Sequence, residues 1–366
     1  MFPYLSIWLL LVLSAVVACM VSFAMTPPVK RFAESIGAVD KPSERRINTV
    51  PIPRMGGLAI FIGFMLALVL FVEFTQPVTG IIVGALIIAI MGAVDDIISL
   101  KPAVKLLFQI IAAIVAIHCG VVFNGITNPL GSPESATIYI NSRLPAIILT
   151  LIWIVGCTNA VNLIDGLDGL AVGVSTISSV TMLIVSLIVS SDVNVSVILA
   201  CLCGACIGFM PYNLNPAKIF MGDVGSQLLG FVLATASTLG LFKLHAVITF
   251  LVPVMAMAVP LADTVFAFFR RIAHGQSPFH ADKGHFHHRL LAMGLSQKQA
   301  VAVLYAVSAV LGLFCVTLSG TDVVMKISCI VVAFIIALAI WVSVLRKHPV
   351  HKVQGDEDVK IYDGKK

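Results

Sequence analysis

The residues of this chain that could do chemistry are gathered in five short stretches, with long apolar runs between them. In order these are the basic segment 30–54, the acid pair 95–96, the polar run 159–169, the turn 221–226 and the histidine cluster 285–289. Carboxylate oxygens suit hard cations such as Mg²⁺, whereas imidazole and guanidinium groups bind phosphate oxygens. Acids, amides and cations in this combination favour chemistry on a phosphate ester.

The adjacent acids Asp95 and Asp96 follow an apolar run. Two neighbouring carboxylates repel each other, so they need a cation, a shared proton or solvent. One reading is a solvated helix end, which explains an isolated Asp-Asp pair well. The other reading, which we carry forward, is a Mg²⁺ ligand next to a general base.

Amide and acid side chains recur at a helical spacing in the polar run. Asn159, Asn162 and Asp165 are three residues apart, which places them along one side of a helix. Gly166 and Gly169 then end the helix and allow a ligand to approach the backbone closely. Asx turns would explain one of these residues but explain the whole series poorly. We therefore expect these side chains in a site.

The last two stretches each leave two readings open. Asp223 begins an apolar run between glycines, so it either caps a helix or lies beside a bound anion such as phosphate. His285, His287, His288 and Arg289 either form a basic loop attracted to anionic lipid or clamp a diphosphate. Zinc is disfavoured there, because no cysteine is near and no His-Glu-x-x-His pattern occurs.

The composition indicates which kind of fold positions these residues. Hydrophobic residues make up 59% of the 366 residues, and charged residues 11%, against roughly 25% in soluble domains. Continuous apolar runs indicate helices rather than a barrel. We expect an all-α polytopic integral membrane protein: a single transmembrane domain at 1–345 and a charged cytoplasmic tail at 346–366. Its eleven predicted spans lie near 5–25, 55–74, 80–94, 102–123, 145–160, 170–190, 195–212, 224–242, 246–268, 299–319 and 323–345.

The basic residues predict the orientation of the spans. All lysines and arginines except Arg143, Lys243 and Lys326 lie in alternate loops or in the tail. The positive-inside rule then places the N-terminus outside, the C-terminus in the cytoplasm and all five stretches at the cytoplasmic face. The same bias accounts for the net charge of +5, so we expect no nucleic-acid partner. The third and fifth runs are short for a crossing, and we expect their helices to continue into the polar motifs.

The motifs resemble, in order, those of the polyprenyl-phosphate N-acetylhexosamine-1-phosphate transferase family. The resemblance covers about Asp40 to Leu290. His285-Phe-His287-His288 departs from the three consecutive histidines typical of the peptidoglycan-precursor branch. It looks more like the bacterial branch that transfers N-acetylglucosamine 1-phosphate from UDP-GlcNAc to undecaprenyl phosphate and releases UMP, opening O-antigen, common-antigen or teichoic-acid synthesis. Another UDP-N-acetyl sugar is the alternative, and a secondary transporter or an intramembrane zinc protease is a distant one.

The resemblance also implies roles for the acids and for one amide. Asp223 and Asn162 are expected to bind Mg²⁺, for which Mn²⁺ could substitute. Asp95 is expected to deprotonate or orient the lipid phosphate, and Asp96 to support metal or lipid binding.

The remaining motif residues are expected to hold the substrate. Asn159 and Asp165 would contact the nucleotide-sugar and order the site, and the histidine cluster 285–289 would bind sugar or diphosphate. The expected location is the bacterial cytoplasmic (inner) membrane, and the family resemblance suggests a homodimer.

Overall fold

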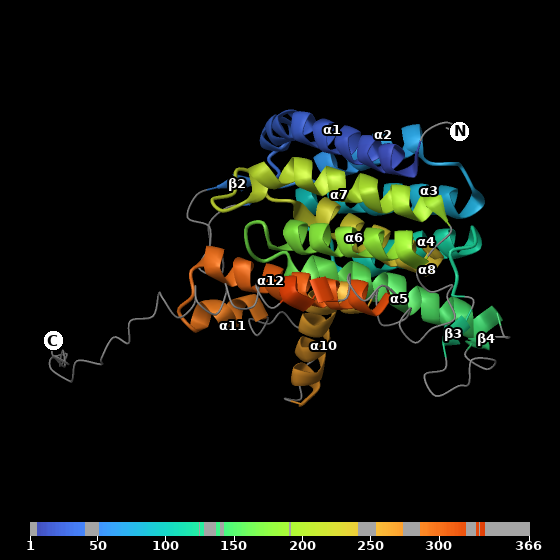
Figure 1. Cartoon of the computed structure of the whole chain (residues 1–366). Helices are drawn as coiled ribbons and strands as arrows, with labels where there is room; N and C mark the ends of the chain where they lie inside the picture. The colour runs from blue at the N-terminus through green and yellow to red at the C-terminus, as the bar shows by residue number, and fades with distance from the viewer. Residues whose placement is uncertain are drawn as a thin grey trace, which may run out of the picture.

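Long apolar runs fold into a stack of helices in the computed structural model. The structure describes residues 6–40, 51–123, 125–127, 137–139, 143–189, 192–240, 254–273, 286–319, 327–328 and 330–333. Figure 1 shows α1 and α2 at one end of the stack and α5 and α12 at the other, while α10 projects away from it.

The described helices and strands have the following bounds. The helices are α1 (Ile7–Ser35), α2 (Gly57–Phe71), α3 (Gln76–Ile98), α4 (Pro102–His118), α5 (Arg143–Ile164), α6 (Leu170–Val189), α7 (Val193–Asn213), α8 (Gly222–Gly240), α10 (Ala258–Ala273), α11 (Phe286–Ala292) and α12 (Gln297–Ser319). The strands form two short antiparallel pairs, β1 (Val39–Asp40) with β2 (Ile52–Pro53), and β3 (Gly125–Thr127) with β4 (Thr137–Tyr139).

Six of the described helices are long and apolar enough to cross a membrane: α1, α3, α5, α6, α7 and α12. Helices α2 and α4 are shorter and also apolar. The prediction of a largely helical, multi-pass membrane protein is therefore confirmed, while eleven spans and their sidedness stay predictions. The last predicted span (323–345) and the tail lie largely or wholly outside the described residues.

Helices α3 and α5 continue into the polar motifs, as their short apolar runs predicted. Helix α3 carries Asp95 and Asp96 in its last turn, and α5 carries Asn159 and Asn162 before it ends at Ile164. A helix end therefore presents each motif.

Helix α1 is longer than the predicted first span, which ends near residue 25. Helix α1 continues through Pro27 and Pro28 to Ser35. Beyond the apolar run it still buries Thr26, Val29 and Ala33, which are spaced to lie on one face of a helix. Packing on that narrow face, rather than continuous hydrophobicity, extends the helix.

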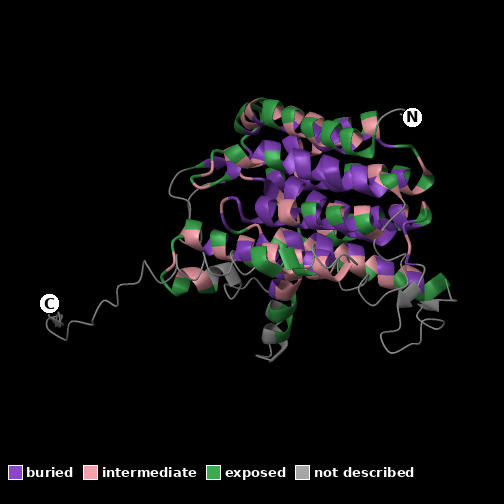
Figure 2. Ribbon diagram, in the orientation of Figure 1, coloured by how far each residue is buried: buried purple, intermediate pink, exposed green. Residues whose placement is uncertain are grey.

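Helix α8 lies at the centre of the bundle. Residues 224–240 of α8 are all buried, and Figure 2 shows burial concentrated in the middle layers, with exposed residues along outer helices such as α1. Many exposed residues on the outer helices are large and apolar, including Trp8, Met20, Leu107 and Ile152. That inside-out pattern suits a protein surrounded by lipid.

Candidate active site

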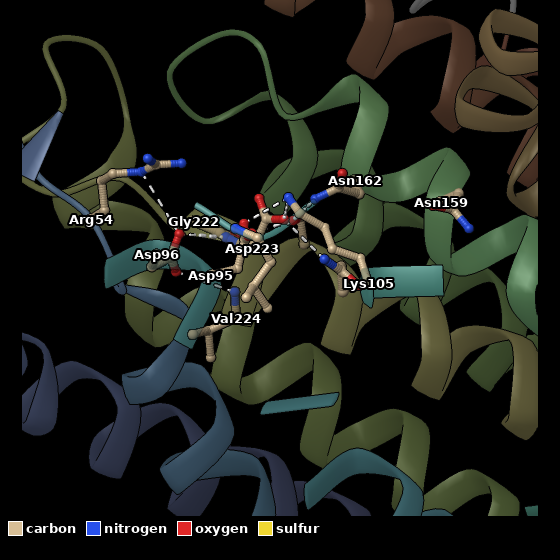
Figure 3. A network of polar contacts seen from close by, with 12 residues as sticks. Arg54, Asp95, Asp96, Lys105, Asn159, Asn162, Gly222, Asp223 and Val224 are labelled. Atoms are coloured by element: carbon tan, nitrogen blue, oxygen red, sulfur yellow. Dashed lines mark hydrogen bonds and ion pairs between the residues drawn. The ribbon is translucent and has the colours of Figure 1, made fainter. Parts of the chain in front are cut away.

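Three acids from two helices gather at one end of the bundle. Asp95 and Asp96 come from the last turn of α3, and Asp223 comes from the first turn of α8. A ligand oxygen from each of the three carboxylates lies within 4.8 Å of the others. Figure 3 shows the three side chains pointing toward one another. The acids that the sequence singled out separately therefore belong to one cluster.

Glycines allow the helices to come this close. A Cβ atom on Gly92 of α3 would lie 2.5 Å from the Val224 Cα atom of α8, and one on Gly57 of α2 would lie 2.0 Å from the Gly225 nitrogen. Gly222 has a φ of +72°, and a Cβ there would lie 2.3 Å from an Asp96 carboxylate oxygen. Side chains at these positions would push the acids apart.

Asp96 joins α3 to the start of α8. Its carboxylate accepts hydrogen bonds from the backbone nitrogens of Asp223, at 3.0 Å, and Val224, at 3.3 Å. The Arg54 Nε atom lies 3.7 Å from the same carboxylate. A carboxylate at a helix N-terminus is favoured by the exposed N–H groups there. Asp96 thereby fixes the position of Asp223.

Lys105 of α4 bridges the other two acids. Its Nζ atom lies 2.6 Å from an oxygen of Asp95 and 2.6 Å from an oxygen of Asp223. The other Asp95 oxygen accepts the Leu100 N–H at 2.6 Å. In the sequence, Lys105 stands out only as one of the charges of a loop. The signal for a role in the site is a lysine inside a largely apolar helix, four residues before Gln109.

The two asparagines of α5 take different positions. Asn162 donates a hydrogen bond to the Ser226 hydroxyl at 2.8 Å and lies beside the Asp223 carboxylate. Asn159 lies farther from the acids (Figure 3) and pairs with Gln109. The structure therefore places Asn162 in the acid cluster and Asn159 in a neighbouring amide network.

Asp165 follows the end of α5. Burial, together with the negative charges of Asp223 and Asp96, raises the pKa of Asp165 to about 8, against the opposing charge of Arg54. Its electrostatic coupling to these residues agrees with a place at the border of the site. A carboxylate in this environment favours a proton or a cation beside it.

Asp168 has a structural task in the turn that follows. Its carboxylate accepts hydrogen bonds from Asn215 Nδ2 at 2.8 Å and from the Ala217 backbone nitrogen at 3.0 Å. These contacts tie the turn after α5 to the loop that leads into α8.

Backbone hydrogen bonds join the segment that contains Arg54 to the same loop. Gly56 and Gly57 donate to the carbonyls of Phe220, at 2.8 Å, and Met221, at 2.7 Å. Arg54 also lies 3.9 Å from Asp40. The start of α2 and the start of α8 thus form one frame around the acids.

Most of the histidine cluster lies outside the described residues. That is true of His285 and of the side chains of His287 and His288. Arg289 is exposed on α11. The proposed diphosphate clamp stays a prediction.

Comparison with known proteins identifies the family. Residues 78–241, which contain all three clustered acids, match the family described as "Glycosyl transferase family 4". A Bacillus subtilis protein named "Probable undecaprenyl-phosphate N-acetylglucosaminyl 1-phosphate transferase" is 38% identical over 314 residues, covering 86% of each chain. The chain belongs to this family of polyprenyl-phosphate N-acetylhexosamine-1-phosphate transferases. It is a phosphoglycosyl transferase of the membrane.

Two other relatives show the breadth of the family. The "Decaprenyl-phosphate N-acetylglucosaminephosphotransferase" of Mycobacterium tuberculosis strain H37Rv is 38% identical over 326 residues, covering 81% of this chain and 79% of the relative. The "Phospho-N-acetylmuramoyl-pentapeptide-transferase" of Staphylococcus epidermidis strain ATCC 12228 is 29% identical over 321 residues, covering 82% and 96%. The transferases named for N-acetylglucosamine are thus the more similar of these relatives.

Proposed function

We propose that the chain transfers N-acetylglucosamine 1-phosphate from UDP-GlcNAc to undecaprenyl phosphate, giving undecaprenyl-diphospho-GlcNAc and UMP. The names of the B. subtilis and M. tuberculosis relatives support N-acetylglucosamine as the sugar. The reaction would be the first membrane step of a bacterial cell-envelope polysaccharide, carried out at the cytoplasmic face of the inner membrane. Another UDP-N-acetyl sugar is the alternative donor.

The convergence of Asp95, Asp96 and Asp223 carries the proposal. Three carboxylates within 4.8 Å of one another, with the Asn162 amide beside them, offer the hard oxygen donors that Mg²⁺ prefers. Asp223 and Asn162 would hold the ion, with Asp95 and Asp96 close by. When bound, Mg²⁺ would offset the negative charge of the substrate phosphates. The donor set therefore fits the cation.

The residues around the acids have distinct tasks in the transfer. An oxygen of the lipid phosphate bonds to the β-phosphorus of the UDP-sugar, the bond between that phosphorus and the bridging oxygen breaks, and UMP leaves. Asp95 would orient the lipid phosphate. Lys105 is placed to compensate charge that builds up on the phosphates. Phosphoryl transfer needs mainly such positioning and charge compensation.

Helix α10 is our candidate for the path of the lipid tail. It follows helical residues 254–256 and a turn at Met257, so the helix is broken at that point. Its exposed side chains include Val265, Phe266 and Phe269. A photoreactive undecaprenyl phosphate should therefore crosslink to α10, and labelling that consistently avoided α10 would contradict this path.

A panel of donors tests the proposed reaction. The purified protein would be given undecaprenyl phosphate, Mg²⁺ and, in turn, UDP-GlcNAc, UDP-GalNAc and UDP-MurNAc-pentapeptide, and UMP release would be measured. We expect UMP release with UDP-GlcNAc and none without the lipid phosphate. UMP release with another donor alone would contradict the proposed sugar. If folded protein released no UMP with any of the donors, the proposed reaction would be contradicted.

A further inference from the structure

A chain of buried amides connects Asp223 to the interior of the bundle, and the proposed function gives it no role. Gln227 is fully buried on α8, one turn after Asp223, and Gln109 on α4 is only 2% exposed. Gln227 Nε2 donates to an Asp223 carboxylate oxygen at 2.9 Å, and Gln109 Nε2 donates to Gln227 Oε1 at 2.9 Å.

The far end of this chain is closed by Asn159 on α5. Asn159 Nδ2 donates to Gln109 Oε1 at 2.6 Å, and Gln109 Nε2 donates to Asn159 Oδ1 at 3.2 Å. Asn159 Nδ2 also donates to the Val155 carbonyl at 2.8 Å. The three amides thus form a hydrogen-bonded series across α5, α4 and α8 that we call the amide relay (Asn159, Gln109 and Gln227).

The Val155 carbonyl sets the direction of the whole relay. A backbone carbonyl can only accept, so Asn159 must turn its NH₂ group toward it. Gln109 must then return its own NH₂ group to Asn159 and to Gln227, and Gln227 is left to present its NH₂ group to Asp223. Only an acceptor suits that last position, and an ionised carboxylate is an acceptor at both oxygens.

We propose that Gln109 and Gln227 are positioning residues for the reaction, which hold the Asp223 carboxylate in a fixed orientation for a divalent cation. The inference rests on the proposed function, because it concerns Asp223 as a cation ligand. Lys105 draws Asp223 toward Asp95, whereas Gln227 holds it from its own helix. Buried polar networks with every member satisfied give a rigid arrangement.

Cation binding by the Gln227→Met variant tests the relay. Methionine has a similar length but cannot donate to Asp223. Mn²⁺ would be the probe, with the free ion measured by electron paramagnetic resonance, and UMP release would be followed against Mg²⁺ concentration. We expect cation affinity to fall about tenfold, as for loss of a hydrogen bond to a charged group, while kcat at saturating Mg²⁺ changes much less.

A second variant separates positioning from folding. Gln109→Met with Gln227→Met removes both partners of one buried hydrogen bond, which disturbs folding less than leaving a donor unpaired. Because both glutamines act through the same contact with Asp223, the double variant should lose no more affinity than Gln227→Met alone. A double variant that loses clearly more cation affinity than Gln227→Met alone would contradict the relay.

The matched control is Thr235→Val. Thr235 is also fully buried on α8, but its hydroxyl bonds to the Phe231 carbonyl within the helix. It should bind Mn²⁺ like the wild type. Unchanged affinity in folded Gln227→Met would overturn the relay alone, whereas wild-type protein that binds no Mn²⁺ would overturn the proposed cation site and the relay with it.

Discussion

At the scale of residues, contacts from four helices converge on Asp223. Its backbone nitrogen donates to Asp96 of α3, and its carboxylate meets Lys105 of α4, Asn162 of α5 and Gln227 of its own helix α8. The acids could be predicted because charges stand out in apolar runs. Lys105 and Gln227 were not predicted, because their importance depends on their contacts with Asp223. Lys105 is 118 positions from Asp223, so only the fold reveals that contact. Gln227 is 4 positions from Asp223, a contact that only a helical spacing reveals.

The Asp165→Asn variant should be more stable than the wild type above neutral pH when no divalent cation is present. The pKa of Asp165 is about 8 in the folded protein, against an ordinary value of 3.8. The folded state therefore holds this proton more tightly than the unfolded state, so its stabilising effect is complete below about pH 4 and is lost as pH rises toward 8. Asparagine removes that dependence.

Thermal unfolding in EDTA between pH 5 and pH 8.5 measures this effect. The midpoint of the wild type should fall more steeply with pH than that of Asp165→Asn. The same variant should lose transferase activity, because asparagine can neither take up the proton nor pair with the cation that the Asp165 carboxyl group favours. Midpoints that change with pH in the same way in both proteins would show that folding does not raise the pKa of Asp165.

At the scale of elements, the site depends on how closely α2, α3 and α8 approach. Asp96 can cap α8 only while Gly92 of α3 lies against Val224. The lengths of α3 and α5 could be predicted, because their apolar runs are too short to cross a membrane alone. The close packing could not, since a glycine in the sequence does not name the helix that it touches.

Gly92→Ala should separate α3 from α8. The added methyl group would lie 2.5 Å from the Val224 Cα atom, so the backbones must move. We expect a loss of about 1–3 kcal/mol in stability and a strong loss of UMP release, since Asp96 and Asp223 would shift apart.

Gly156→Ala is the matched control for this substitution. Gly156 lies in the middle of α5, and a Cβ atom there meets nothing within 4 Å. Alanine favours a helix by up to about 1 kcal/mol over glycine, so this variant should be active and at least as stable as the wild type. Equal activity of Gly92→Ala would contradict the proposed need for close packing.

At the scale of the whole molecule, the acids, Lys105 and Arg54 occupy one end of the helix stack. The positive-inside pattern predicts that this end faces the cytoplasm, where a UDP-sugar would reach it. Green fluorescent protein fused after Lys366 should therefore fluoresce, and alkaline phosphatase inserted into loop 124–142 should be active. The reverse pattern, from fusions that retain transferase activity, would contradict the proposed orientation.

The most direct measurement is UMP release by purified Asp223→Asn, with UDP-GlcNAc, undecaprenyl phosphate and Mg²⁺. The substitution keeps the size of the side chain but weakens one cation ligand, so turnover should be abolished while the protein remains folded in the membrane. The control is Asp192→Asn, which retains a capping side chain at the start of α7 and should keep its activity. Near-normal turnover by folded Asp223→Asn would contradict the assignment of the catalytic centre to these acids.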